Sequence, residues 1–249
     1  MGALDGKIAW VTGGGGGIGE AGARSMAEAG AHVVLTGRRA EELERVKADI
    51  EGAGGKAEVL TLDVTDREAV EAAAAELGDR LGGVDILLAN AGMNIPNRDT
   101  ESLTNADFAQ VMDVNVNGVM YGVMAVLPQM RAKGGGLVMM VSSWAGRHAS
   151  KLTGPAYNAS KHAVVALSHS INQEEAKNGV RSCVIMPGEV NTPIMEKRPV
   201  PPPQEVRAKM LQPEDMGRLI RFVAESPAHV CINEVLISPT HNRLFVSAS

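Results

Sequence analysis

Tyr157 and Lys161 stand four residues apart in a stretch with a helical pattern, so one helix face would carry a phenol beside an ammonium group. A phenol with its ordinary pKa of about 10 is a poor acid–base catalyst at neutral pH. A neighbouring ammonium favours the phenolate and draws that pKa toward the working range. The pair therefore indicates proton transfer, although a Tyr-x-x-x-Lys spacing alone more often joins a surface tyrosine to a solvated lysine.

Two serines, Ser142 and Ser143, end an apolar run upstream of this helix. If the run is a strand of a parallel sheet, its carboxyl end faces the crevice in which such sheets bind ligands. A serine hydroxyl there could hold a substrate oxygen beside the phenol. The sequence leaves open which of the two serines would do so.

A glycine-rich segment follows the first apolar run and precedes a helical stretch. Glycines let the backbone approach a ligand closely, and the N–H groups of a helix start point at an anion. The segment satisfies both G-x-G-x-x-G and T-G-x-x-x-G-x-G, through Gly13, Gly14, Gly16, Gly17 and Gly19. Its place between a strand and a helix favours a dinucleotide phosphate site over a flexible turn without a ligand.

The end of the second apolar run indicates which dinucleotide binds. An acidic residue at that place would bond the ribose hydroxyls of NAD, whereas an arginine accommodates the 2′-phosphate of NADP. Here Gly37 is followed by Arg38 and Arg39, and the first carboxylate is Glu41. The two guanidinium groups favour NADP over NAD. The alternative is a solvated arginine pair, and the glycine segment itself carries no basic residue.

Seven short apolar runs, several without alternation, have the character of strands covered on both faces. They are Lys7–Thr12, Ala31–Gly37, Ala57–Leu62, Val84–Asn90, Gly136–Ser142, Val180–Met186 and Ile232–Ile237. Six helical stretches fall between them: Ile18–Gly30, Ala40–Ala53, Asp66–Leu81, Asn105–Ala132, Ala156–Gly179 and Pro213–Glu225. Thr65 and Asn105 are candidate helix caps. The alternation predicts an α/β fold with one doubly wound, Rossmann-type parallel sheet of about seven strands.

No repeat or linker divides the chain, so residues 1–249 are expected to form one cofactor-binding and catalytic domain. The segment Gly188–Gln212 has five prolines and no clear periodicity, which is typical of a substrate lid. With the loop Met93–Thr100 it should shape the substrate pocket. Met195 and Trp144 are candidate lining residues, and core packing is the alternative for both.

The composition is that of an ordinary globular protein, with 249 residues, 45% hydrophobic and 21% charged. The formal net charge of −5 does not have the excess of basic residues that is typical of nucleic-acid-binding proteins. No apolar run is long enough to predict a membrane span, and no secretion signal core follows Met1. Cys183 and Cys231 are expected to be reduced core thiols, and the histidines form no metal site. We therefore expect a cytoplasmic protein without metal, membrane or nucleic-acid partner.

These features together resemble the short-chain dehydrogenase/reductase family over nearly the whole chain. Further motifs that carry the resemblance are Leu62-Asp63-Val64, Asn90-Ala91-Gly92, Asn115 in Asp113-Val114-Asn115-Val116, and Pro187-Gly188 with Val190 and Thr192. The resemblance implies that the cofactor is bound by Gly13, Gly16, Gly17, Ile18, Arg38, Arg39, Asp63, Val64, Asn90, Ala91, Gly92, Tyr157, Lys161, Pro187, Val190 and Thr192. It also implies a homotetramer.

The resemblance implies a catalytic tetrad. Tyr157 would exchange a proton with the substrate oxygen, and Lys161 would lower the phenol pKa and hold the nicotinamide ribose. Ser143 would bond the substrate oxygen, and Asn115 would keep a water that links Lys161 to solvent. The implied activity is hydride transfer between NADP(H), or less favourably NAD(H), and a secondary alcohol or its carbonyl compound.

Three departures from the family pattern narrow this expectation. Ala89 stands where many members have an asparagine, and Ser143 lies one residue further from Tyr157 than in many members. The end of the chain, Ile232–Ser249, lacks the Asp-Gly-Gly closing common in ketoacyl-carrier reductases. It resembles instead NADP-dependent 3-hydroxy acid dehydrogenases of the serine type, so a 3-hydroxy acid or a small ketone is a candidate substrate. A non-catalytic dinucleotide sensor would need none of the tetrad, and sugar-nucleotide epimerases or dehydratases usually have longer chains.

Overall fold

The computed structural model of the chain describes residues 2–198 and 200–242. Its strands form one parallel sheet in the order β3-β2-β1-β4-β5-β6-β7. They are β1 Ile8–Thr12, β2 His32–Gly37, β3 Lys56–Thr61, β4 Ile86–Ala89, β5 Gly136–Val141, β6 Val180–Pro187 and β7 Glu234–Ile237. The strand order turns back between β1 and β4, so the carboxyl ends of these neighbours open the crevice where such sheets bind ligands. The doubly wound α/β fold predicted from the sequence is confirmed.

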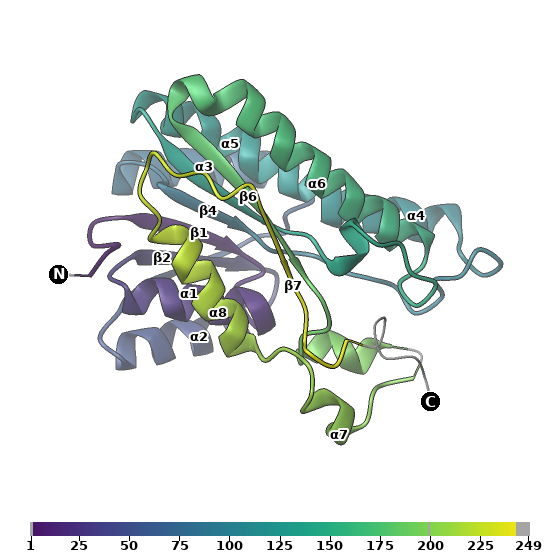
Figure 1. Ribbon diagram of the computed structural model, residues 1–249. Helices are drawn as coiled ribbons and strands as arrows, with labels where there is room; N and C mark the ends of the chain where they lie inside the picture. Colours follow the sequence, from purple (N-terminus) through teal and green to yellow (C-terminus); the bar gives the residue numbers. More distant parts are fainter. Residues whose placement is uncertain (1, 199, 243–249) are drawn as a thin grey trace.

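Helices cover both faces of the sheet (Figure 1). They are α1 Gly17–Glu28, α2 Ala40–Gly52, α3 Arg67–Leu81, α4 Asn105–Met112, α5 Gly118–Ala132, α6 Pro155–Glu175, α7 Gln204–Arg207 and α8 Pro213–Ala224. Side chains of α1, α2 and α8 form one buried cluster with the sheet, and those of α3, α5 and α6 form another. This double cover explains why β1 and β4 are buried at every residue and, apart from Thr12 at the end of β1, carry apolar side chains without alternation.

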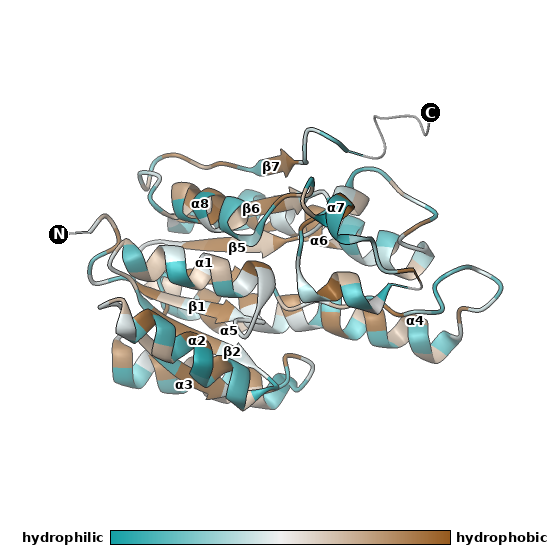
Figure 2. Cartoon of the chain, turned by 90° about the horizontal axis from the view of Figure 1, so that it is seen from below, coloured by the Kyte–Doolittle hydropathy of each residue, from teal (hydrophilic) through white to brown (hydrophobic). Residues whose placement is uncertain are grey.

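The hydropathy pattern follows these layers (Figure 2). The central strands are coloured as hydrophobic, while the surface helices carry hydrophilic residues on their outer sides. In α8, for example, Met216 and Ile220 are fully buried and Phe222 is exposed. The apolar stripe of each helix therefore faces the sheet and fixes the connections that shape the crevice.

The predicted helix Asn105–Ala132 is interrupted by a π-helical turn at Asp113–Asn117. By length and hydropathy alone, the whole stretch could cross a membrane. Its second half, α5, contacts α3, β4 and β5 and buries Val123 and Val126 completely, as a core helix does. Apolar periodicity continues through the interruption, which is why the sequence predicted one helix.

Both predicted caps are wrong by one residue. Asp66, not Thr65, caps α3 and accepts a hydrogen bond of 3.0 Å from the N–H of Ala69. Thr104, not Asn105, caps α4 in a capping box with Asp107. In each case the capping side chain belongs to the extended residue just before the helix, from which it reaches the third helical N–H group.

The predicted lid Gly188–Gln212 is not structureless. It contains a 3₁₀ helix at Pro193–Lys197 and the short helix α7, and Val190 forms a parallel bridge with Leu211. Pro199 of this segment and the last seven residues of Ile232–Ser249 lie outside the described residues. Proline removes backbone donors but also favours helix starts, and Pro193 begins the 3₁₀ helix.

Of the two cysteines, only Cys183 is a core thiol. It lies within β6 and is 1% exposed, and burial raises the pKa of its thiol to about 12. Cys231 is exposed, because β7 begins at Glu234 rather than at Ile232 and leaves Cys231 in the connection from α8. The prediction of two core thiols is therefore wrong for Cys231.

Candidate active site

Tyr157 and Lys161 lie on α6, which begins at Pro155 after Gly154. Gly154 has a φ of 78°, a conformation that side chains other than glycine rarely adopt, and this turn directs the chain into the helix. The nitrogen of Lys161 lies 5.6 Å from the centre of the Tyr157 ring. The predicted i, i+4 spacing therefore places the phenol and the amine side by side.

The carboxyl end of β5 holds the Lys161 side chain. Its Nζ donates a hydrogen bond of 2.9 Å to the carbonyl oxygen of Val141, and the residue is 3% exposed. Burial lowers the pKa of Lys161 to about 8, since the charged form loses its hydration. The amine can therefore exchange a proton near neutral pH.

The structure raises the pKa of the Tyr157 phenol, whereas the sequence predicted a lowered value. Burial is the largest cause, and it outweighs a hydrogen bond with Ser143 and the nearby guanidinium groups of Arg198 and Arg98, all of which act in the opposite direction. The expectation is therefore wrong for this structure. Lys161 is buried, whereas Tyr157 is half-buried at the cavity, and the Lys161 nitrogen donates its hydrogen bond to Val141 O rather than to the phenol.

The two serines have different surroundings. Ser142 is buried and donates a hydrogen bond of 2.7 Å to the carbonyl oxygen of Lys161, so its hydroxyl ties β5 to α6. Ser143 forms the hydrogen bond with Tyr157 and lines the same cavity as the phenol. Of the two, only Ser143 is placed to meet a substrate oxygen beside Tyr157.

Asn115 lies in the π-helical turn and is completely buried. Its Oδ1 accepts a hydrogen bond of 2.8 Å from the N–H of Met93, and its Nδ2 donates to Met93 O and to Ser160 Oγ. A Cβ atom placed on Gly92 would lie 3.3 Å from Lys161 Nζ and 3.4 Å from Asn115 Oδ1. The asparagine and the lysine therefore meet at the turn after β4.

The glycine segment has the backbone that a phosphate site needs. Gly13 and Gly17 have φ values of 67° and 57°. A Cβ on Gly19 would collide with Gly13 O, whereas a Cβ on Gly16 would meet nothing within 4 Å. The turn thus packs tightly against its own helix and is open at Gly16, in front of the N-terminus of α1. These residues fit the pyrophosphate of a dinucleotide.

The turn after β4 is attached to this glycine segment. Asn90 Nδ2 donates hydrogen bonds of 3.0 Å and 3.2 Å to the carbonyl oxygens of Thr12 and Gly13. The N–H groups of Asn90 and Ala91 both donate to Thr12 Oγ1. These contacts tie the turn after β4 to the end of β1 and place Asn90, Ala91 and Gly92 along the crevice.

Arg38 and Arg39 are exposed, with 70% and 72% of their side chains accessible. Arg38 lies 3.7 Å from Asp63, whose other oxygen accepts hydrogen bonds from Thr65. Burial opposes the charged form of Asp63, but the Thr65 bonds and Arg38 together lower its pKa. The ends of β2 and β3 thus present a cation beside a fixed carboxylate. Val64 is buried next to Gly118.

The start of the lid lies against the glycine segment. Thr192 is 8% exposed, and a Cβ on Gly17 would lie 3.1 Å from its Cγ2 atom. Pro187 ends β6, and Val190, which lies between Pro187 and Thr192 in the sequence, is buried in the core. Thr192 therefore lies beside the glycine segment, and Val190 anchors the start of the lid in the core.

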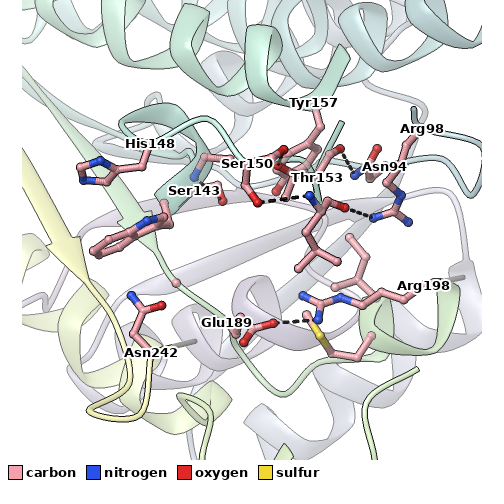
Figure 3. A pocket seen from close by; sticks show the side chains of 16 residues that line it. Asn94, Arg98, Ser143, His148, Ser150, Thr153, Tyr157, Glu189, Arg198 and Asn242 are labelled. Atoms are coloured by element: carbon pink, nitrogen blue, oxygen red, sulfur yellow. Dashed lines mark hydrogen bonds and ion pairs between the residues drawn. The ribbon is translucent and has the colours of Figure 1, made fainter. Parts of the chain in front are cut away.

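A cavity of about 150 Å³ opens beside Tyr157 (Figure 3). It is lined by Asn94, Arg98, Ser143, Trp144, Ala145, His148, Ser150, Leu152, Thr153, Tyr157, Gly188, Glu189, Ile194, Met195, Arg198 and Asn242. The loop Met93–Thr100 and the segment Gly188–Gln212, both expected to shape a substrate pocket, contribute residues to this lining, as does the connection from β5 to α6. The sequence did not single out Arg98, Arg198 or Glu189, because no spacing tells which residues of an irregular loop point inward.

A family model described as short chain dehydrogenase matches residues 7–201. An uncharacterized oxidoreductase of Staphylococcus haemolyticus is 32% identical over 95% of this chain and 98% of its own length. A glycine betaine reductase of Emericella nidulans is 35% identical over 96% of this chain, which spans only 19% of that longer protein. A solved short-chain oxidoreductase of metagenomic origin, in complex with NADP, is 31% identical with a TM-score of 0.83, over 96% of this chain and 99% of that one. With its parallel sheet, glycine segment and tyrosine–lysine helix, the chain belongs to the short-chain dehydrogenase family of oxidoreductases.

Proposed function

We propose that this protein is an NADP-dependent dehydrogenase or reductase that interconverts a secondary alcohol and its carbonyl compound. The observation that carries the proposal is that the Tyr157 phenol and the Ser143 hydroxyl line one cavity while the buried Lys161 amine lies 5.6 Å from the centre of the phenol ring. A sensor that only bound a dinucleotide would need neither this trio nor a cavity beside it. A sugar-nucleotide epimerase or dehydratase is disfavoured by the small volume of the cavity.

The cofactor would be held along the carboxyl ends of β1, β2, β3, β4 and β6. Its phosphates would lie on Gly13, Gly16, Gly17 and Ile18, its adenosine half near Arg38, Arg39, Asp63 and Val64, and its nicotinamide half near Asn90, Ala91, Gly92, Tyr157, Lys161, Pro187, Val190 and Thr192. When bound, the nicotinamide supplies or accepts the hydride. The protein residues supply binding, orientation and the proton.

In reduction, the Tyr157 phenol donates its proton to the carbonyl oxygen as that oxygen gains negative charge. Ser143 donates a hydrogen bond to the same oxygen and holds it beside the phenol. Lys161 stabilises the resulting phenolate, which offsets the burial that raises the phenol pKa. In oxidation the same residues act in reverse, with Tyr157 as the base.

Asn115 positions the part of the site around Lys161. Its side chain is engaged with Met93 and Ser160, so it fixes the turn after β4 and the start of α6 relative to one another. A π-helical turn leaves backbone groups out of the regular helical pattern, which suits the binding of a water that carries protons between Lys161 and solvent.

NADP is favoured over NAD by Gly37, which carries no side chain, and by the exposed Arg38 beside it. The solved relative in complex with NADP supports the same choice. Asp63 partly neutralises Arg38, so the 2′-phosphate would compete with this carboxylate for the guanidinium group. The preference is therefore proposed as strong but not absolute.

The substrate is proposed to be a small molecule, either a 3-hydroxy acid or a small ketone. Residues 1–249 would act as one catalytic unit with the segment Gly188–Gln212 as its lid, in a cytoplasmic homotetramer without nucleic-acid or membrane partners. A spectrophotometric screen of small ketones and 3-hydroxy acids with NADPH, NADP⁺, NADH and NAD⁺ tests the activity. Cofactor binding without turnover of any compound in the panel would contradict it and favour the sensor.

A further inference from the structure

Arg98 lies in the wall of the cavity beside Tyr157, in the loop between β4 and α4 (Figure 3). Its Nε is buried and makes no hydrogen bond within the described residues. One terminal nitrogen donates a long hydrogen bond of 3.4 Å to Leu152 O. A guanidinium group has five N–H donors, so most of its hydrogen-bonding capacity is unused by the described part of the chain.

The second guanidinium group in the cavity, that of Arg198, has an ion-pair partner. Arg198 donates a hydrogen bond of 2.7 Å to Glu189, and both side chains are largely buried. No ion pair involves Arg98 within residues 2–198 and 200–242. Arg198 is thus paired with Glu189, and among the described lining residues the guanidinium group for which no ion pair is found is that of Arg98.

The position of Arg98 is fixed by the start of the catalytic helix. A Cβ on Gly154 would collide with the carbonyl oxygen of Arg98 and lie 2.9 Å from its Cβ. The same loop is held by Asn94, whose Nδ2 donates a hydrogen bond of 2.9 Å to Thr153 O. The backbone of Arg98 therefore packs on the turn that leads into Tyr157, and the two side chains share one cavity.

A cation that is partly removed from water and has no partner is unfavourable, and an anionic ligand relieves that cost. Burial and the neighbouring Arg198 both lower the pKa of Arg98, and a bound anion would have the opposite effect. Arginine binds carboxylates through two parallel hydrogen bonds, which fixes orientation as well as charge. A volume of about 150 Å³ is that of a cavity that holds one benzene-sized molecule.

Resting on the function proposed above, we infer that Arg98 binds the carboxylate of a small hydroxy or oxo acid and so turns the reacting oxygen toward Tyr157 and Ser143. Arg98 is a substrate-binding residue in this account, and it decides between the two candidate classes in favour of the acid. A neutral ketone of the same length would leave the guanidinium group without its partner.

The kinetic test compares 3-hydroxybutanoate with its methyl ester, using NADP⁺, in the parent protein and in Arg98→Gln. The parent should have the higher kcat/KM for the acid by at least ~10-fold, as expected for a charge-assisted contact. In Arg98→Gln this acid-to-ester ratio should fall by roughly 10- to 100-fold. Arg98→Lys keeps the charge but cannot form two parallel hydrogen bonds with a carboxylate, so its acid-to-ester ratio should lie between those of the parent and Arg98→Gln. Lys151→Gln, an exposed charge outside the cavity lining, is the matched control and should keep the parent ratio.

A second measurement does not depend on turnover. Calorimetric titration compares butanoate with the neutral butanamide, in the parent and in Arg98→Gln, each with and without NADP⁺. The parent should bind butanoate more tightly than butanamide, and Arg98→Gln should lose the difference. Circular dichroism and the Tm show whether the variant is folded, and Arg98→Lys serves as the variant if it is not.

The outcomes separate this inference from the proposed function. Turnover of neutral alcohols with no preference for acids, together with equal binding of butanoate and butanamide, would overturn the inference and leave the dehydrogenase intact. Arg98-dependent binding of butanoate without any turnover would support the carboxylate site and contradict the dehydrogenase. Absence of both turnover and butanoate binding would contradict both.

Discussion

The amine of Lys161 donates a hydrogen bond to the carbonyl oxygen of Val141, the last residue of β5. This bond holds a largely buried lysine at the end of the strand that leads to Ser143, beside the phenol of Tyr157. The bond does not fully replace water, and the pKa of the amine remains lowered to about 8. The residue proposed to stabilise a phenolate thus carries its charge at the expense of fold stability.

A pH dependence of stability follows from Lys161. Its pKa is about 8 in the folded protein and about 10.5 in the unfolded chain, so between these values the unfolded chain binds more protons. The contribution of Lys161 to the free energy of unfolding is therefore constant and at its lowest below pH ~8, and it increases between pH ~8 and pH ~10.5. The difference in free energy of unfolding between the parent and Lys161→Met should therefore rise by roughly 3 kcal/mol over this interval. Urea unfolding of both proteins without cofactor measures the difference, and a difference independent of pH would show that the amine is not desolvated.

Gly16 and Gly19 should separate folding from cofactor binding. A Cβ on Gly19 collides with Gly13 O, so Gly19→Ala should lower the free energy of unfolding by about 1–3 kcal/mol. A Cβ on Gly16 meets nothing within 4 Å and its φ of 172° is open to any residue, so Gly16→Ala should fold normally. It should nevertheless weaken NADPH binding, because the methyl group would occupy the proposed phosphate position. Gly52→Ala, at an equally open position on α2, is the control, and its cofactor affinity should equal that of the parent.

Arg38 should determine the choice of dinucleotide. Arg38→Ala should weaken the binding of NADP by roughly 1–3 kcal/mol and leave the binding of NAD close to that of the parent. Arg39→Ala tests the neighbouring side chain, which lies toward Glu42 rather than Asp63. Fluorescence titration with both dinucleotides gives the ratio of dissociation constants. Equal affinities of the parent for NADP and NAD would contradict the proposed role.

The segment Gly188–Gln212 should become more ordered when the cofactor binds. Its Thr192 already touches Gly17 of the glycine segment, so phosphates in the turn would lie next to the start of the lid. Hydrogen exchange of Val190–Gln212 should therefore slow in the presence of NADP, as a closing lid excludes water from the hydride step. Exchange that is the same with and without NADP would identify the segment as a fixed structural loop.

Much of this architecture could be predicted from the sequence because uninterrupted apolar runs report burial on both faces. The strand predicted at Val84–Asn90 is β4 Ile86–Ala89, and Asn90, which follows the strand, joins it to the glycine segment. The spacing of Tyr157 and Lys161 likewise requires only a helix. These features depend on local pattern, which the sequence displays directly.

The features that escaped prediction depend on contacts between distant segments. The π-helical turn around Asn115 is held by Met93, which lies 22 positions away in the sequence. Arg98 points into the cavity because Gly154 permits a close approach of its backbone. The phenol pKa is set by the burial of Tyr157, which a spacing of four residues does not reveal. Each of these properties comes from packing rather than from periodicity.

The most direct test of the central claim is the turnover of Tyr157→Phe. The substitution keeps the ring and removes the proton that is proposed to reach the substrate oxygen, so steady-state reduction with NADPH should fall by ~100-fold or more. The dissociation constant of NADPH, measured by fluorescence titration on the same preparation, should stay close to that of the parent. A Phe variant with near-parent turnover would contradict the account, because the proton would then come from another group.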